Sequence, residues 1–249
     1  MLSDNLTRVR HRMGQACQRC GRDPSSVTLV AVTKGVAIEH IREAILLGLK
    51  QFGENRVQEA HLKQQELSRG REPFTADRVP ETVHGTPYTV HDIKWHLIGH
   101  LQRNKARDAA RIFQMIHSVD SMELADALDR QVQDREPMDV LVQVNVSGEA
   151  TRFGCREDAV GRLVQEVGRR PHLRVRGLMT MAPFTEDPEA ARPVFRRLRA
   201  LRDNVARALS LEPSALSLSM GMSHDFEVAI EEGADFVRIG TALFGARDA

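Results

Sequence analysis

The residue with the clearest chemical potential is Lys34, which directly follows the apolar stretch Leu29–Thr33. Lysine is scarce in this chain, since only five of the 35 Lys and Arg residues are lysine. A lysine at the end of a buried strand loses hydration, which lowers its pKa and makes a free amine available. Such an amine can form a Schiff base with an aldehyde. The alternative at this stage is a lysine that snorkels to solvent or pairs with a carboxylate.

Two glycine-containing segments near the C-terminus could bind a phosphate group. They are Ser219–Ser223 (Ser-Met-Gly-Met-Ser) and the pair Gly240 and Thr241. Glycine lets backbone N–H groups approach an anion, and hydroxyl groups add hydrogen bonds. Each segment alone is equally compatible with an ordinary turn. Combined with Lys34, the two segments suggest a site for pyridoxal 5'-phosphate (PLP), which reacts with lysine through its aldehyde.

Arg238 lies two residues before Gly240 and could face the same site. A guanidinium stays protonated below pH ~12, so it can donate a hydrogen bond to the pyridine nitrogen of PLP but cannot accept one. The ring nitrogen would then carry no proton, and the ring would be a poor electron sink. The alternative for Arg238 is a structural ion pair.

Strand and helix patterns alternate along the rest of the chain. The first twenty residues predict an amphipathic helix, because apolar residues recur every three or four positions. The predicted strands are Thr28–Thr33, Gln51–Gly53, Trp95–Gly99, Gln114–Val119, Val140–Val146, Val175–Thr180, Ala215–Ser219 and Phe236–Ile239. The predicted helices are Ile38–Leu47, Arg56–Leu67, Asn104–Arg111, Met122–Gln133, Asp158–Arg169, Glu189–Leu209 and Phe226–Glu232, with a short one after Thr241.

Eight strand–helix units in 249 residues favour an α/β fold of the (βα)8 TIM-barrel type, with an extra N-terminal helix. We expect one domain over residues 1–249. The loops after the strands would build the site, and these loops contain Lys34, Glu54, Asn55 and His100. The segment 68–92 holds three prolines and two glycines and interrupts the pattern. Because it connects a helix to a strand, we expect a surface excursion on the opposite face.

Composition excludes several classes of function. The net charge of +1 provides no field for nucleic acid or an anionic membrane. The first dozen residues contain no apolar core of a secretory signal, and no apolar run approaches the ~18 residues of a membrane helix. Three cysteines cannot form a disulfide framework, so we expect a cytoplasmic protein.

Several longer motifs occur in an order that resembles one family. They are LVAVTK, FGENRVQEA, KWHLIGHLQRNKA, HSVDS, RGLMTMAP and LSMGMSHDFEVAIEEGADFVRIGTALFGAR. This chain resembles the pyridoxal phosphate homeostasis proteins, which are single-barrel relatives of the N-terminal domain of alanine racemase. The resemblance runs from about Val27 to Arg247 and leaves out mainly the 68–92 excursion.

The resemblance implies a racemase-like PLP-binding barrel in which Lys34 forms the internal aldimine and Asn55 lies beside the cofactor ring. Arg238 matches the arginine at the pyridine nitrogen. The matching phosphate ligands are Ser219, Gly240 and Thr241. The family is not credited with a turnover reaction, so no catalytic residue and no metal ligand are assigned. It is thought to hold PLP and deliver it to apo-enzymes, which balances vitamin B6 and amino-acid pools, and we expect a monomer or weak dimer.

The chain departs from the family pattern after the fifth predicted strand. The family usually has Ser-Lys before the glycine of this loop, whereas this chain has Thr151 and Arg152. Arginine keeps the charge but cannot form a Schiff base. The 68–92 segment is also longer than the usual connection.

Two other kinds of barrel enzyme remain as alternatives. A PLP-dependent racemase needs acid–base groups on both faces of the substrate carbon. Racemases take the second one from a tyrosine of a C-terminal domain, whereas the only tyrosine here is Tyr88, and we expect the chain to end with its barrel. A Schiff-base aldolase without PLP would leave Arg238 without a role. A visible absorbance band would distinguish the aldolase from both PLP alternatives.

A metal site is the remaining alternative. His91, His96 and His100 are close in sequence, but four residues of strand span ~13 Å, so His96 and His100 would not share one metal. Cys17 and Cys20 form a single Cys-x-x-Cys without a second pair. On an amphipathic helix, these two cysteines favour packing over metal binding.

Overall fold

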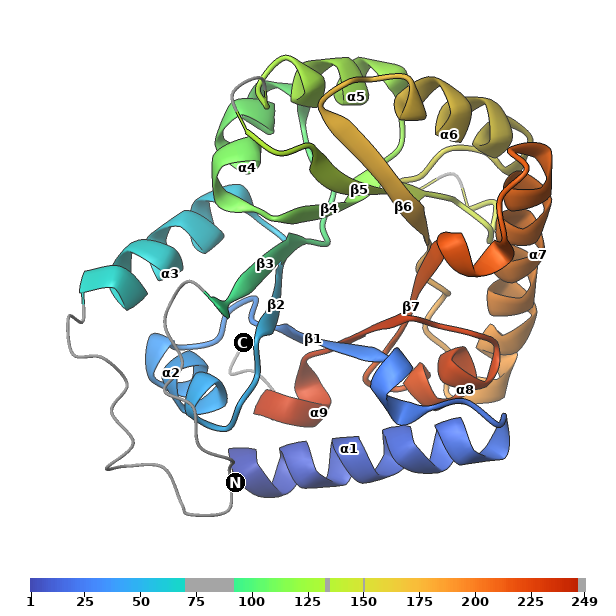
Figure 1. Ribbon diagram of the computed structural model, residues 1–249. Helices are drawn as coiled ribbons and strands as arrows, with labels where there is room; N and C mark the ends of the chain where they lie inside the picture. Colours follow the sequence, from blue (N-terminus) through green and yellow to red (C-terminus); the bar gives the residue numbers. More distant parts are fainter. Residues whose placement is uncertain (70–91, 133–134, 150, 246–249) are drawn as a thin grey trace.

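Eight parallel strands close into a barrel that is covered by helices (Figure 1). The computed structural model describes residues 1–69, 92–132, 135–149 and 151–245. The strands follow one another around the barrel in sequence order, and β8 pairs with β1. They are β1 (Thr28–Val32), β2 (Gln51–Glu54), β3 (Lys94–Leu97), β4 (Met115–Val119), β5 (Met138–Gln143), β6 (Leu173–Met179), β7 (Ser217–Met222) and β8 (Phe236–Ile239). The predicted (βα)8 barrel is confirmed.

Helices surround the barrel, and most of them connect one strand to the next. They are α1 (Leu2–Arg19), α2 (Ile38–Leu46), α3 (Val57–Arg69), α4 (Ala106–Ile112), α5 (Met122–Asp129), α6 (Val160–Gly168), α7 (Arg192–Ala208), α8 (Phe226–Glu231) and α9 (Thr241–Phe244). In the described part of the chain, none of them has the length and apolarity that crossing a membrane requires. Residues 70–91, which make up most of the predicted 68–92 excursion, lie outside the described residues.

The core lies between the sheet and the helices. Its largest fully buried side chains include Phe52 on β2 and Phe195 on α7. The N-terminal helix α1 packs against α8 and α9, as Figure 1 shows, and buries the apolar face that its spacing predicted. Cys17 is fully buried in this face, and Cys20 packs partly against it; neither forms a disulfide. The packing interpretation of this cysteine pair is therefore confirmed.

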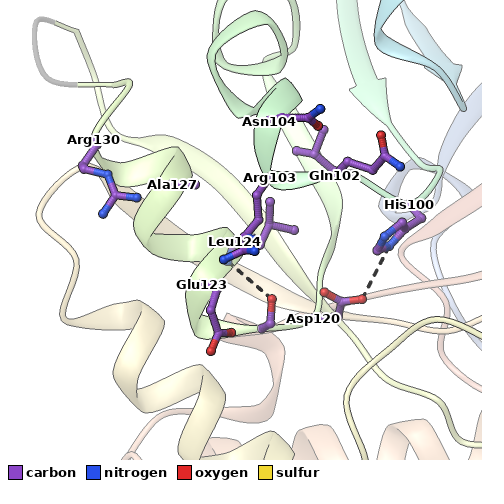
Figure 2. A pocket seen from close by; sticks show the side chains of 11 residues that line it. His100, Gln102, Arg103, Asn104, Asp120, Glu123, Leu124, Ala127 and Arg130 are labelled. Atoms are coloured by element: carbon purple, nitrogen blue, oxygen red, sulfur yellow. Dashed lines mark hydrogen bonds and ion pairs between the residues drawn. The ribbon is translucent and has the colours of Figure 1, made fainter.

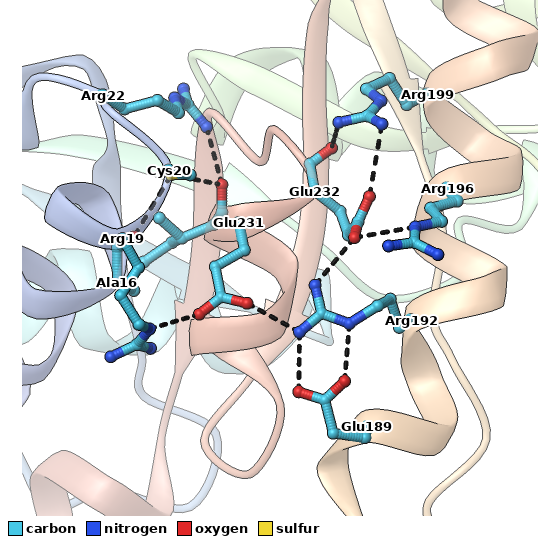
Figure 3. Close-up of polar contacts among 11 residues, drawn as sticks. Ala16, Arg19, Cys20, Arg22, Glu189, Arg192, Arg196, Arg199, Glu231 and Glu232 are labelled. Atoms are coloured by element: carbon cyan, nitrogen blue, oxygen red, sulfur yellow. Dashed lines mark hydrogen bonds and ion pairs between the residues drawn. The ribbon is translucent and has the colours of Figure 1, made fainter.

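A cluster of ion pairs holds α1, α7 and α8 together (Figure 3). Glu231 accepts hydrogen bonds from Arg19 and Arg192, at 2.6 and 2.7 Å. The nearly buried Glu232 accepts from Arg192 at 2.8 Å and from Arg196 at 3.0 Å. A buried carboxylate is stable only when it is paired in this way. The cluster fixes α8, which connects the two strands that carry the predicted phosphate segments.

The end of strand β7 differs from the prediction. The sequence predicts a strand over Ala215–Ser219, whereas the strand runs from Ser217 to Met222. Its pairing with β8 shifts register between Ser219 and Met222, so β7 contains a bulge. Gly221 adopts a φ of +89° there, and a Cβ on it would lie 2.5 Å from the Ala229 side chain. Ser219 therefore lies inside the strand, which ends at Met222.

Candidate functional site

A cavity of about 470 Å³ opens at the carboxyl ends of the strands, which is where barrels build their sites. Segments at the ends of β1, β2, β3, β6, β7 and β8 line it. Five of the six residues predicted to bind a cofactor are among its lining: Lys34, Asn55, Arg238, Gly240 and Thr241. The barrel thus brings together side chains that are more than 200 positions apart in sequence.

A wider and more open hollow of about 940 Å³ lies beside this cavity, and His100 lines both. Figure 2 shows His100 with its Nδ1 directed at the carboxylate of Asp120, 3.6 Å away. The ring of Phe153 stacks on His100 with centroids 3.7 Å apart. Since the wider hollow contains none of the six predicted residues, the predicted chemistry is concentrated in the smaller cavity.

Lys34 lies in a tight turn two residues beyond β1. The turn closes through a hydrogen bond from Val36 N to the Thr33 carbonyl oxygen, and Gly35 takes a φ of +67°. The Lys34 side chain is half-buried and lines the cavity. Within the described residues, its amine forms no hydrogen bond and no ion pair. The alternative of an ion-paired Lys34 is therefore not supported.

A second lysine, Lys63, donates a hydrogen bond to the backbone of this turn. Lys63, on α3, is nearly buried, and its Nζ donates to the Thr33 carbonyl oxygen at 2.6 Å. It also donates to Glu54 and to Glu59, both at 2.7 Å. Glu59 in turn accepts from the backbone N–H of Gly35. Burial raises the pKa of Glu54, while Lys63 and a hydrogen bond from Thr33 oppose that shift. Lys63 thus joins α3 and β2 to the turn that carries Lys34.

We expect the substitution Lys63→Met to lower the free energy of unfolding by about 3–5 kcal/mol, because it leaves the fully buried Glu54 carboxylate without its charge partner. For a chain of this size, that loss corresponds to a melting temperature lower by about 6–20 °C. Differential scanning calorimetry of the cofactor-free protein measures it. The matched control is the double variant Glu54→Gln/Lys63→Met, which removes the charge and should recover much of the loss. A free energy of unfolding for Lys63→Met within ~0.5 kcal/mol of the wild-type value would contradict the expectation.

Asn55 is positioned by a close contact between two backbone segments. A Cβ on Gly99 would lie 2.4 Å from the carbonyl oxygen of Asn55. Only glycine at position 99 therefore allows the loop after β3 to lie against the loop after β2. This contact places Asn55 and Gly99 together in the wall of the cavity.

The ends of β7 and β8 bring two backbone donors together. The N–H groups of Gly240 and Ala242 both donate to the hydroxyl oxygen of Ser223, at 3.1 and 3.2 Å. Ser223 lines the cavity, as do Gly240 and Thr241. Converging N–H groups beside hydroxyl groups match the donor set of a phosphate site. Ser223 was not among the predicted site residues, although it ends the same Ser-Met-Gly-Met-Ser segment.

Arg238 is buried inside the barrel at the base of the cavity. Its guanidinium donates to Ser219 Oγ at 2.6 Å and to the Thr180 carbonyl oxygen at 2.8 Å. Burial lowers its pKa to about 10, and the nearby Asp225 opposes that shift. The side chain therefore stays protonated at neutral pH. No carboxylate of the described residues lies within ion-pair distance of Arg238, so the alternative of a structural ion pair is not supported.

Ser219 lies deeper in the barrel than Gly240 and Thr241, the other two residues predicted to bind the phosphate. It is fully buried, does not line the cavity, and contacts Arg238 and the Nδ1 of His117. This position differs from that of the other five residues, because β7 continues beyond Ser219 to Met222 and keeps Ser219 inside the strand. His96 is likewise buried in the barrel, whereas His100 lines the cavity. The described residues contain no cluster of three or more His, Cys, Asp or Glu arranged to hold a metal.

Arg152, which replaces the usual family lysine, does not line the cavity. Its guanidinium donates to Glu149 at 2.9 Å and to the carbonyl oxygens of Met181 and Ala182, both at 3.4 Å. The side chain therefore ties the loop after β5 to the loop after β6.

Comparisons with known proteins agree with this fold and site. The chain matches the family described as alanine racemase, N-terminal domain, over residues 5–248. It is 42% identical over 245 residues to the pyridoxal phosphate homeostasis protein of Aquifex aeolicus, covering 98% of this chain and 97% of the relative. It is 43% identical over 248 residues to the protein of that name from Pseudomonas aeruginosa, covering 99% and 96%.

A solved structure extends the comparison to three dimensions. PipY of Synechococcus elongatus, solved with PLP bound, has 32% sequence identity and a TM-score of 0.77, and the match covers 98% of this chain and all of PipY. Both the sequences and the folds therefore agree over nearly the full length. This chain belongs to the alanine racemase N-terminal domain family and, within it, to the pyridoxal phosphate homeostasis proteins.

Proposed function

We propose that this protein binds PLP in the 470 Å³ cavity and holds it for use elsewhere in the cell. The observation that carries the proposal is the amine of Lys34, which has no hydrogen-bond or ion-pair partner among the described residues. It lines the same cavity as Ser223, whose hydroxyl oxygen accepts from the N–H groups of Gly240 and Ala242. The PLP-bound structure of PipY supports the choice of ligand.

The residues of the cavity fit the functional groups of PLP one by one. The amine of Lys34 can condense with the aldehyde, which forms a C=N bond and releases one water. The guanidinium of Arg238 can donate to the pyridine nitrogen. The N–H groups of Gly240 and Ala242, with the hydroxyls of Ser223 and Thr241, can bind the phosphate. Asn55 lines the wall and would lie beside the ring.

The charge of Arg238 explains why such a site would retain PLP without turning over substrates. Bound PLP can draw electrons from a substrate carbon when its ring nitrogen carries a proton. Arg238 has a pKa of about 10 and uses only two of its five N–H donors, on Ser219 and the Thr180 carbonyl oxygen. It can therefore offer the ring nitrogen a further donor, but no acceptor for a proton. The residues around the ring therefore favour binding over catalysis.

The role in the cell follows from the relatives. They are named for the homeostasis of pyridoxal phosphate, and we assign this protein the same role in balancing PLP and amino-acid pools. Its partners would be PLP itself and the apo-enzymes that accept it, in the cytoplasm.

A weak racemase-like side activity is the second candidate. The observation that favours it is His100, which lines the cavity together with Lys34 and has the carboxylate of Asp120 3.6 Å from its Nδ1. Two titratable groups in one cavity could act as acid and base on a substrate carbon.

An absorbance spectrum of the purified protein with and without added PLP tests the main proposal. We expect a visible band that survives desalting and disappears after borohydride reduction. A protein that remains colourless after incubation with PLP would overturn the proposal.

Two serine variants test which residue contacts the phosphate. We expect Ser223→Ala to raise the Kd for PLP by about 10–100-fold, because a hydrogen bond to a charged group contributes about 1.5–3 kcal/mol. Its Kd for pyridoxal, which lacks the phosphate, should stay unchanged. Ser219→Ala should weaken PLP and pyridoxal by the same factor, since Ser219 acts on Arg238. Isothermal titration calorimetry measures all four constants, and the reverse pattern would restore Ser219 as the phosphate ligand.

A further inference from the structure

A row of buried polar side chains continues from Arg238 into the interior of the barrel. Arg238 Nη1 lies 2.6 Å from Ser219 Oγ, and Ser219 Oγ lies 2.9 Å from Nδ1 of His117. The Nε2 of His117 lies 2.9 Å from Nδ1 of His96, whose Nε2 is 2.7 Å from Oε1 of Gln51. We call these five residues the interior chain. It connects β8, β7, β4, β3 and β2, and it crosses the barrel from β7 to β4.

The donors and acceptors in the interior chain fix the direction of its hydrogen bonds, from Arg238 toward Gln51. A guanidinium can only donate, so Ser219 accepts from Arg238. The hydroxyl proton of Ser219 then needs an acceptor, and the Nδ1 of His117 is the partner in reach. If Nδ1 accepts, the proton of a neutral His117 is on Nε2, which donates to His96. By the same step, His96 carries its proton on Nε2 and donates to Gln51.

The surroundings keep both imidazoles neutral. Burial lowers the pKa of His96 to about 4, with Lys94 adding to that shift. Burial also lowers the pKa of His117 well below its ordinary value, and His96 and Arg238 act in the same direction. A protonated His117 would carry a proton on Nδ1 as well, so Nδ1 could no longer accept the hydrogen bond from Ser219 that the interior chain requires. The interior chain is therefore complete only when its histidines are uncharged.

We propose that His117, acting through Ser219, is a positioning residue that fixes the guanidinium of Arg238 and thereby sets how firmly the cavity holds the ring of PLP. The inference rests on the proposed function. Ser219 Oγ accepts from Nη1 of Arg238, and the backbone carbonyl oxygen of Thr180 accepts from Nη2, so the two contacts hold two different nitrogens of the guanidinium. Loss of the Ser219 contact would free the guanidinium to rotate, because one anchor would remain.

The first test needs no cofactor. Nitrogen-15 NMR of the PLP-free protein at pH 7 reports the protonation state of each ring nitrogen. We expect both His96 and His117 to be neutral with the proton on Nε2. A proton on Nδ1 of His117 would reverse the direction of the interior chain and overturn the proposal.

The second test follows the cofactor in a pair of variants. His117→Leu removes the acceptor for Ser219, whereas His117→Asn offers a side-chain carbonyl oxygen in its place. We expect PLP release to be about 10-fold faster in the leucine variant, the equivalent of one neutral hydrogen bond. The asparagine variant should stay within about 3-fold of wild type. PLP labelled with nitrogen-15 in its ring should change its chemical shift in His117→Leu and recover it in His117→Asn.

The chemical shift separates positioning from a loss of stability, since weaker packing alone would not change the environment of the ring nitrogen. If His117→Leu does not fold, Ser219→Ala cuts the same link with the loss of one oxygen and should give the same shift. An unchanged shift and unchanged release in a folded variant would refute the role of His117. If wild-type protein shows the Nε2 protons but binds no PLP, the proposed function fails, and the link to the cofactor fails with it.

Discussion

Lys34→Ala is expected to abolish covalent capture of PLP. Borohydride reduction should attach PLP to nearly every wild-type molecule and to almost none of the variant, because Lys34 is the lysine that lines the cavity. Of the other four lysines, Lys63 is held by two carboxylates and the Thr33 carbonyl oxygen. The remaining three, Lys50, Lys94 and Lys105, do not line the cavity. Peptide mapping of the reduced wild-type protein should place the label on Lys34.

Lys34→Arg is the matched control for this result. It keeps the positive charge in the cavity but cannot condense with an aldehyde. We expect it to bind PLP reversibly through the phosphate and ring contacts, and to lose the borohydride-stable label. A stable label on Lys50, Lys94 or Lys105 in wild type would contradict the assignment, and so would full labelling of the alanine variant.

Most of the fold follows from patterns within short segments. Alternating apolar strands and amphipathic helices predict the eight units of the barrel, and each observed strand overlaps its predicted range. The β7 end could not be predicted, because Gly221 looks like a turn residue and only the pairing with β8 makes it part of a bulge. As a consequence, Ser219 is buried inside the strand, and Ser223, the next serine in the segment, is the one that lines the cavity.

In the site, too, residues marked by their neighbours in sequence could be predicted, whereas residues placed by contacts distant in sequence could not. That Lys34 and Arg238 would lie together in one cavity could be predicted, because each stands at a strand end or beside a glycine segment. His117 could not, since its partner Ser219 is 102 residues away in sequence and three strands away around the barrel. The role of Lys63 could not be predicted either. A lysine on a helix normally faces solvent, and only the packing of α3 against β2 makes this one a buried support for the Lys34 turn.

Arg238→Ala should weaken PLP retention without creating a catalyst. The substitution would remove the proposed donor to the ring nitrogen, and it leaves Ser219 and the Thr180 carbonyl oxygen without their partner. Because each hydrogen bond to a charged group contributes about 1.5–3 kcal/mol, we expect PLP release to accelerate about 10–100-fold. Stopped-flow transfer of PLP to an excess of apo-enzyme measures the rate. Racemisation and transamination of alanine should stay at the wild-type level.

Arg238→Glu tests whether this arginine is what keeps the site from catalysing reactions. A carboxylate at position 238 would be buried near Asp225, and burial already raises the pKa of that group. Its most favourable partner would be a protonated ring nitrogen, so bound PLP should shift toward the form with a protonated ring. A protonated ring is the better electron sink, and we therefore expect side reactions with amino acids to rise while PLP retention falls. Wild-type turnover of ~1–10³ s⁻¹, the range of ordinary enzymes, would show that Arg238 does not suppress catalysis and would make the protein a racemase-like enzyme.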